Sequence, residues 1–378
     1  MSFNKHSSSD LYQTKPISDN FSNQLTLFLN NASRSPLPLS HQRILTNYMH
    51  QWECGEHDPY YVNFNQSDEL RRELSRFIAC SADNISIQTN VAQSFSIILH
   101  GLNWHDGDEV ILVENDYPSV TLPFQAHPSI QPKWVCPVNG LAQLDDIQAL
   151  ITPKTRAIAL SWVSYATGQI QDIEGLSKLC KQHDVLLLVD ATQALGVIPI
   201  NLADTPVDFF TASLYKWCFC PQGMAVGIFS DALMSTLTPI SSGVFSQHDR
   251  GIRYRPNEPC LTARQFEFGN LNILGIMLAC ETFRWFHSIG ISTIYKTISN
   301  LSQQLLDLVY QKSYKTPINY ASDHGSGIIS FYHPTPDSFM AKLSDNGGSA
   351  TFRDGYIRLS PGIYQNRSTV SKLADILD

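Results

Sequence analysis

Apolar residues along this chain follow two different patterns. Short segments rich in apolar residues, as expected of strands, occur at residues 109–113, 157–163, 185–189, 207–212 and 225–229. The segment 185–189 is apolar throughout, which is typical of a strand that is buried on both faces. Elsewhere, apolar residues recur every three or four positions, as on one face of a helix, in segments that begin near Ser67, Ala92, Asp145 and Asp172. We expect Ser67 and Asp172 each to cap a helix N-terminus. Alternating strands and helices predict a mostly parallel central sheet that is flanked by helices on both sides.

The pattern changes after Gly269. Helical segments follow at residues 273–288 and 294–310, and then come strand-like runs at 327–332 and 356–359 and a last helix that starts near Ser368. We therefore expect an α/β protein in three parts. These are an N-terminal segment that packs on the small domain or on a partner, a large domain, and a smaller α+β C-terminal domain, at residues 1–58, 59–272 and 273–378.

Composition narrows the class of protein. The chain has 378 residues, of which 43% are hydrophobic and 16% charged, as in folded globular proteins. A net charge of −8 argues against a nucleic-acid partner. No signal peptide or membrane-spanning run is found, and the 8 cysteines have no zinc-ligand spacing. We expect a cytoplasmic protein with no metal site and no membrane contact.

A carboxylate follows one of the buried strands directly. Asp190 comes immediately after residues 185–189, at the edge of a parallel sheet where ligands bind. A buried carboxylate is costly unless it has a cationic partner, although an Asp that caps the next turn is the alternative. Gln193 follows three residues later and brings a second polar group to the same edge.

A lysine follows the next buried run. Lys216 lies among Tyr215, Trp217 and Cys218, in a segment without another charge. The alternative is a lysine whose stem covers apolar surface while its amine reaches water. A desolvated lysine instead has a lowered pKa and can attack an aldehyde as a neutral amine.

The turn before the second helix, residues 89–94, offers a third feature. Backbone N–H groups at a helix N-terminus favour a phosphate, although many polar helix starts look the same. A carboxylate for a pyridine nitrogen, a buried lysine and a phosphate cup are together what a pyridoxal-phosphate enzyme needs.

Three stretches of sequence resemble the class V aminotransferase family of fold-type I pyridoxal-phosphate enzymes. They are VDATQALGVIPINL, SLYKW followed by PQGMAVGIF, and YIRLSPGIYQN, at residues 189–202, 213–229 and 356–366. The family includes cysteine desulfurases, kynureninases and isopenicillin N epimerase-like proteins. Looser similarity extends from about Asn63 to the C-terminus.

The resemblance implies a role for each matching residue. Lys216 would hold pyridoxal 5'-phosphate as a Schiff base and then move the substrate α-proton, and Asp190 would pair with the pyridine N–H. Gln193 would bind the ring 3-oxygen, Tyr117 would stack on the ring, and Arg358 would bind the substrate α-carboxylate unless it is a surface arginine. The phosphate would be bound by Ser213, Tyr215, Ala92, Gln93 and, from a partner subunit, Asn270. That last contact implies a homodimer with the active site at its interface.

Departures from the family bear on the reaction. The phosphate turn reads Val-Ala-Gln where desulfurases usually have Gly-Thr-Thr, and Tyr165 falls where many members have Asn. Tyr215 before the lysine looks kynureninase-like, but Val120 replaces the Asp that kynureninases carry. Residues 335–357 contain no cysteine, where desulfurases keep their nucleophilic thiol, so a persulfide mechanism is disfavoured.

Several functions remain open at this point. The leading hypothesis is a transaminase or a β-eliminating lyase of the C–S type that acts on a small amino acid. Kynureninase-like hydrolysis and epimerisation come next, and a non-catalytic protein that binds the cofactor is an alternative of another class. A nicotinamide dehydrogenase is disfavoured because no GxGxxG follows an early strand. The arginines of residues 245–264 could select an acidic substrate, although a solvated loop explains them as well.

Overall fold

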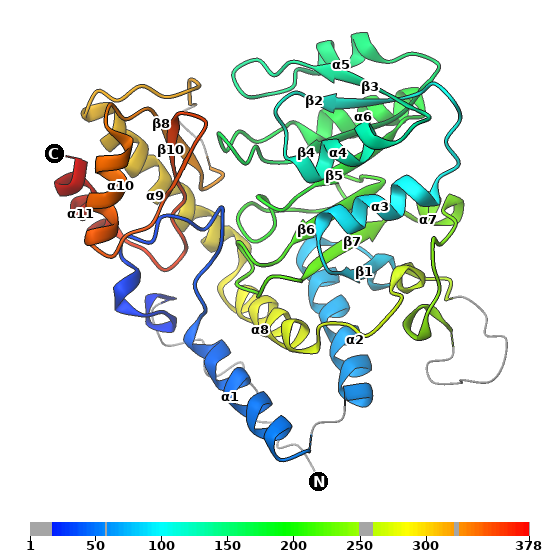
Figure 1. The fold of residues 1–378 in the computed structure, drawn as a ribbon, viewed down its shortest axis with the longest axis horizontal. Helices are drawn as coiled ribbons and strands as arrows, with labels where there is room; N and C mark the ends of the chain where they lie inside the picture. The colour runs from blue at the N-terminus through cyan, green and yellow to red at the C-terminus, as the bar shows by residue number, and fades with distance from the viewer. Residues whose placement is uncertain (1–16, 57–58, 249–259, 321–324, 378) are drawn as a thin grey trace.

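The computed structural model describes residues 17–56, 59–248, 260–320 and 325–377, which form two lobes (Figure 1). The larger lobe is built on a seven-stranded sheet in the order β1-β7-β6-β5-β4-β2-β3. Only β7 runs antiparallel to its neighbours, so the predicted mostly parallel sheet is confirmed. Its strands are β1 (Ile85–Gln88), β2 (Asp108–Val113), β3 (Ile130–Val135), β4 (Thr155–Ser161), β5 (Leu186–Asp190), β6 (Phe209–Ser213) and β7 (Ala225–Phe229).

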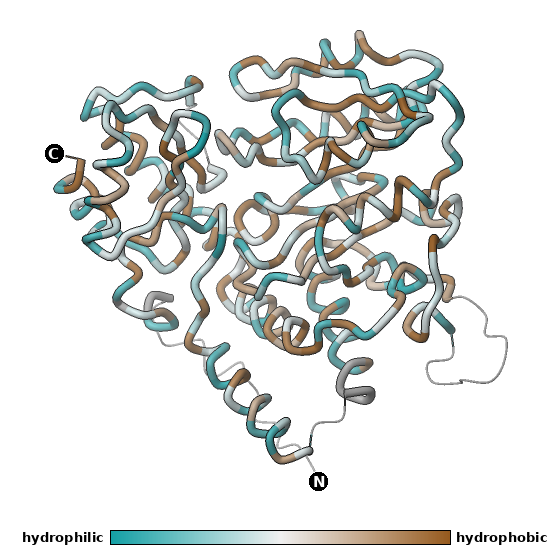
Figure 2. The backbone as a smooth tube through the Cα atoms, in the orientation of Figure 1, coloured by the Kyte–Doolittle hydropathy of each residue, from teal (hydrophilic) through white to brown (hydrophobic). Residues whose placement is uncertain are grey.

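Helices cover both faces of this sheet because its strands bury side chains on both sides. In β2, Ile111 packs into one hydrophobic core and Val110 into another. The first core is shared with α2 (Pro59–Ile78), α5 (Leu144–Leu150), α6 (Ile173–His183) and α8 (Ile273–Ile289). The second core is shared with α3 (Val91–Gly101), α4 (Pro118–Ala126) and α7 (Asp231–Thr236). In Figure 2 the central strands are largely brown, as strands buried on both faces should be.

The smaller lobe is built on a three-stranded antiparallel sheet in the order β8-β10-β9. Its elements are α9 (Ile291–Gln311), β8 (Ile329–Phe331), α10 (Pro336–Asp345), β9 (Thr351–Arg353), β10 (Tyr356–Leu359) and α11 (Arg367–Leu377). All of them except β9 share a core with Leu27 and Leu29 of the N-terminal segment. Helix α8 packs instead into the core of the large lobe, and α9 contributes to both cores. The predicted domain limits stay a prediction.

The N-terminal segment runs between the two lobes. Asn31 N and Ala32 N donate to Ser360 of the small lobe, and Ser35 N donates to the carbonyl of Tyr215 in the large lobe. Helix α1 (Leu39–Glu53) follows and packs against α8. Residues 31–35 therefore connect the segment around Lys216 with the small lobe.

Helix limits agree with the sequence patterns where capping is local. Asp172 caps α6 by accepting from Gly175 N at 2.8 Å, as predicted. The prediction that Ser67 caps a helix is wrong, because α2 begins at Pro59 and the Ser67 hydroxyl donates to the carbonyl of Phe64 within the helix. Within the described residues, no helix is long and apolar enough to cross a membrane.

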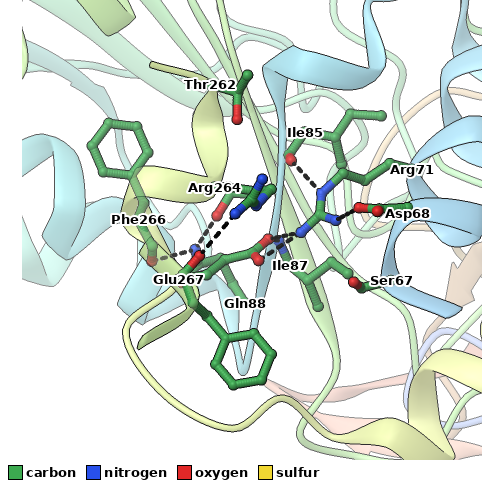
Figure 3. A network of polar contacts seen from close by, with 12 residues as sticks. Ser67, Asp68, Arg71, Ile85, Ile87, Gln88, Thr262, Arg264, Phe266 and Glu267 are labelled. Atoms are coloured by element: carbon green, nitrogen blue, oxygen red, sulfur yellow. Dashed lines mark hydrogen bonds and ion pairs between the residues drawn. The ribbon is translucent and has the colours of Figure 1, made fainter. Parts of the chain in front are cut away.

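The outer edge of β1 is closed by a buried ion pair (Figure 3). Arg71 of α2 donates from Nη2 to both carboxylate oxygens of Glu267 at 2.5 Å and from Nε to the carbonyl of Ile85 at 3.1 Å. Glu267 also accepts from Ile87 N at 2.7 Å. These bonds satisfy backbone groups of an edge strand that has no further strand beside it.

Candidate active site

A small cavity lies at the carboxyl ends of β4, β5 and β6. Its lining includes four residues that the sequence singled out for the cofactor, together with four others: Lys216, Asp190, Gln193, Tyr117, Ser161, Val163, Tyr165 and Thr192. The structure therefore brings the lysine and the carboxylate to the same cavity. The three strands end side by side because they are parallel and adjacent, which is where open α/β sheets bind ligands.

Lys216 is a buried amine without a counter-ion in direct contact. Its side chain is 6% exposed, and Nζ makes no hydrogen bond or ion pair with the described residues. It lies 5.2 Å from the ring centroid of Tyr117 and 5.8 Å from that of Tyr215. Burial lowers the pKa of Lys216 to about 8, and the carboxylate of Asp190 opposes that shift. An appreciable fraction of this amine is therefore neutral near neutral pH.

Asp190 ends β5 with its carboxylate in the cavity. It is 4% exposed, and Oδ1 accepts from Thr192 N at 2.9 Å. Burial raises the pKa of Asp190, whereas the bonds from Thr192 and the charge of Lys216 lower it. Thr192 in turn accepts from Ser213 N at 3.0 Å, so one hydroxyl links the ends of β5 and β6.

Asp116 is a second carboxylate beside the cavity, half-buried, which the sequence analysis did not single out. It accepts from Ser161 N at 2.7 Å and from Tyr117 N at 2.6 Å, so it holds Tyr117 against the end of β4. Burial raises the pKa of Asp116 to about 6, and the charge of Asp190 raises it further. The signal that selects Asp190, a carboxylate close behind a buried strand, also applies to Asp116, which follows β2.

Gln193 lies in the cavity with its amide held by two partners. Its side-chain oxygen accepts from the indole of Trp217 at 2.7 Å, and its nitrogen donates to the carbonyl of Ala32 at 3.0 Å. An amide nitrogen has two hydrogens, so one donor is left for a ligand. The predicted contact with the ring 3-oxygen remains a prediction, and Trp217 is a partner that the sequence did not reveal.

Arg358 of β10 reaches the cavity wall from the small lobe. Its guanidinium donates to the carbonyl of Tyr165 and to the hydroxyl of Ser33, both at 2.6 Å. The side chain is 6% exposed, and Nε is buried without a partner among the described residues. Burial lowers the pKa of Arg358 to about 10, and the charge of Arg353 adds to that shift. An unpaired donor on a buried arginine favours an anionic ligand.

The predicted phosphate residues lie around the same sheet edge but outside the cavity lining. Helix α3 follows β1 in the chain, and at its start the side chain of Asn90 accepts from Gln93 N at 2.8 Å. Ser213 is the last residue of β6, and Tyr215 follows two positions later. Their phosphate contacts stay predictions.

Two further predictions concern residues away from the cavity. Asn270 is exposed on the segment before α8, and its reach into a partner's site stays a prediction. Arg250, Arg253 and Arg255 lie outside the described residues.

The groups in and around this cavity fit pyridoxal phosphate. A buried amine without a hydrogen-bond partner suits an aldehyde, and a buried carboxylate beside it suits a protonated ring nitrogen. The first N–H groups of α3 have no acceptor within the helix, which suits a phosphate. In the described residues, no group of three or more His, Cys, Asp or Glu side chains could hold a metal ion.

Comparisons with known proteins bear on the family and the fold of the chain. The family model described as Aminotransferase class-V matches residues 36–344. An uncharacterized aminotransferase of Schizosaccharomyces pombe is 22% identical over 94% of this chain and 92% of its own length. A probable cysteine desulfurase of Methanothermobacter thermautotrophicus is 24% identical over 87% of this chain and 84% of its own length.

Solved structures share the fold. A mutant of C-DES with glycine covalently linked to its PLP cofactor superposes with a TM-score of 0.86 at 20% identity, covering 96% of this chain and all (100%) of that one. A cysteine desulfurase of Thermococcus onnurineus NA1 has a TM-score of 0.83 at 20% identity, over 93% of each chain. At these identities the likeness is one of fold.

Proposed function

The chain belongs to the class V aminotransferase family, and from that premise we propose that it acts on a small amino acid as a transaminase or as a β-eliminating lyase of the C–S type. It is a pyridoxal-phosphate-dependent enzyme, as this family is. The observation that carries the proposal is the shared cavity of Lys216 and Asp190. An amine that burial keeps partly neutral suits both capture of an aldehyde and removal of a proton.

Each group of the cavity has a task in this proposal. Bound pyridoxal phosphate supplies an electron sink that acidifies the Cα–H bond of an attached amino acid. Lys216 holds the cofactor and then carries the α-proton on Nζ. Asp190 keeps the ring nitrogen protonated, and the carbonyl and hydroxyl bonds of Arg358 orient its guanidinium toward the substrate carboxylate.

The loop before Arg358 weighs against desulfurase chemistry. Strands β9 and β10 are joined by a turn of Asp354 and Gly355, and the chain has no cysteine after Cys280. Cys218 and Cys220 are buried, and burial raises their pKa well above the ordinary value, so neither is a nucleophilic thiolate. Transamination and elimination both need only the groups already present in the cavity.

Product analysis separates these two reactions. The purified protein with pyridoxal phosphate is incubated with a panel of amino acids, with and without a ketoacid acceptor. Ketoacid formed only with the acceptor identifies transamination, and ketoacid formed with ammonia in its absence identifies elimination. Lys216→Ala should lose either reaction, and a wild-type protein that yields no product with the whole panel contradicts the proposal.

The same preparation tests a purely binding role. Borohydride reduction followed by peptide mapping should place the cofactor on the peptide that contains Lys216. Cofactor trapped there without turnover of any amino acid would favour a non-catalytic binding protein. Cofactor trapped elsewhere would refute the assignment of Lys216.

We also propose that the working form is a homodimer, as is typical of the family. Asn270 would then reach the partner's phosphate site. Its exposed position before α8 is compatible with that reach. Sedimentation of the purified protein tests the dimer, and Asn270→Ala tests the contact through cofactor affinity.

A further inference from the structure

The β9–β10 hairpin carries a second arginine beside Arg358. In its register Arg358 is paired with Thr351 and Tyr356 with Arg353. Opposed residues of an antiparallel pair project to the same face, and so do residues two apart on one strand. Arg353 and Arg358 therefore share one face of the small sheet, and the contact from Arg358 Nη2 to Thr351 Oγ1 at 3.3 Å lies on it.

The arginine face is turned toward the cavity. The opposite face of β10 presents Ile357 and Leu359, which are fully buried in the core of the small lobe. On the arginine face both guanidinium groups lie beside Tyr165, which lines the cavity. Arg358 donates to its carbonyl at 2.6 Å, and the Cζ atom of Arg353 lies 5.8 Å from its ring centroid.

The turn fixes where Arg353 stands. Asp354 and Gly355 have φ angles of 53° and 86°, the left-handed pair required by a type I′ hairpin turn. Such a two-residue turn fixes the register of the two strands. Arg353 is therefore held two residue pairs along the hairpin from Arg358 and nearer to the solvent, where it is exposed.

The charge of Arg353 has no carboxylate partner within the described residues. Burial lowers the pKa of Lys216 and of Arg358, and the positive charge of Arg353 lowers both further. Asp190 is assigned to the ring nitrogen and Asp116 to backbone amides. Two guanidinium groups thus lie against Tyr165 at the wall of the cavity, while the α-carboxylate of an ordinary amino acid needs one.

We infer that Arg353 binds a second anionic group of the substrate, so that the enzyme selects amino acids with an acidic side chain, such as aspartate, glutamate or cysteine sulfinate. The inference rests on the proposed function, in which Arg358 takes the α-carboxylate. Tyr165 then separates the two anion positions. Its ring supports one guanidinium and its carbonyl fixes the other.

The experiment compares acidic amino acids with their neutral amides. We measure kcat/KM of the holoenzyme for aspartate and glutamate against asparagine and glutamine, in wild type, Arg353→Gln and Arg353→Lys. Arg43→Gln, an exposed arginine on α1, is the control for loss of one surface charge. Binding of succinate and glutarate, against butyrate, is measured by calorimetry and needs no turnover.

Arg353→Gln should lower kcat/KM for the acidic substrates by about 10-fold to 100-fold and leave the amides within about twofold, because a hydrogen-bonded charge pair is lost. Arg353→Lys should retain part of the preference, and Arg43→Gln all of it. Succinate or glutarate should bind the wild type more tightly than butyrate does, and this difference should vanish in Arg353→Gln.

A wild type that prefers the amides, or an Arg353→Gln variant that loses acidic and neutral substrates equally, would overturn the inference. If no amino acid reacts, the proposed function fails. The calorimetry still decides the inference in that case, because equal binding of the dicarboxylates to wild type and Arg353→Gln would contradict it.

Discussion

Trp217 donates its indole N–H to the side-chain oxygen of Gln193 at 2.7 Å, and both side chains are buried. Because an indole N–H can only donate, this bond fixes the Gln193 amide with its oxygen toward Trp217. The amide nitrogen is thereby directed to the carbonyl of Ala32 and to the cavity. The residue after the lysine thus orients a group that we propose to contact the cofactor.

Replacement of Trp217 by Phe should weaken cofactor binding about 10-fold. The Gln193 oxygen would be left buried without a donor, at a cost of about 1–3 kcal/mol, and the amide would be free to turn over. Titration of the apoprotein with pyridoxal phosphate, followed by quenching of intrinsic fluorescence, measures the affinity. Trp285→Phe makes the same chemical change in the buried aromatic cluster of α8 and should leave the affinity unchanged.

The inner strands of the large sheet were predictable from the sequence, and its two edge strands, β1 and β3, were not. Residues 225–229 and 356–359 are strands with the limits that their apolar runs predict. Strand β1 was not predicted because its apolar residues alternate with Ser86 and Gln88. These two polar side chains are buried nevertheless, since the Gln88 amide donates to the Ser86 hydroxyl and to the Phe266 carbonyl. Strand β3 contains Pro132, which only an edge strand tolerates.

The site was predictable as far as it follows the ends of buried strands. Asp190 and Lys216 were found in this way, and Asp116 could have been. Ser33 and Ala32 could not, because their contacts with Arg358 and Gln193 join positions that lie far apart in the sequence. Such contacts depend on how the N-terminal segment packs between the lobes, and no local pattern encodes that.

Cofactor uptake by the apoprotein should accelerate as the pH rises through about 8. Burial lowers the pKa of Lys216 to about 8 from 10.5, so the proton that blocks the amine leaves near that pH rather than above 10. Asp190 raises the pKa of Lys216, so Asp190→Asn should move the midpoint to lower pH. Stopped-flow absorbance of cofactor binding gives the midpoint, and a midpoint above 10 in the wild type would contradict the assignment.

The same shift has a consequence for stability. Between about pH 8 and 10.5 the unfolded lysine binds a proton that the folded one does not, so the free energy of unfolding of the apoprotein should rise with pH across this interval. Lys216→Met should lack this rise, because it has no proton to bind. Urea unfolding of both apoproteins at several pH values measures the difference.

Glu267→Gln should destabilise the fold by about 3–5 kcal/mol, because removing one charge of a buried pair leaves the other uncompensated. Arg71 would keep its charge with only Asp68 beside it, and Ile87 N would lose a charged acceptor. Urea unfolding with an unchanged m-value reports the loss. The exposed arginine of the Arg76–Glu73 pair is the control, and Arg76→Ala should change stability far less. Equal losses in the two variants would contradict the importance of burial.

Arg358→Lys should lower kcat/KM by about 10-fold to 100-fold for every amino acid, acidic or neutral. Lysine keeps the charge but loses the planar fork that can hold a carboxylate with two bonds. The bonds of Arg358 to Tyr165 and Ser33 also fix its direction, so Ser33→Ala should give a smaller loss of the same kind. Steady-state kinetics on one acidic and one neutral substrate measure both effects. A uniform loss in Arg358→Lys beside a selective loss in Arg353→Gln would separate the two anion positions, whereas an unchanged kcat/KM in Arg358→Lys would mean that the α-carboxylate binds elsewhere.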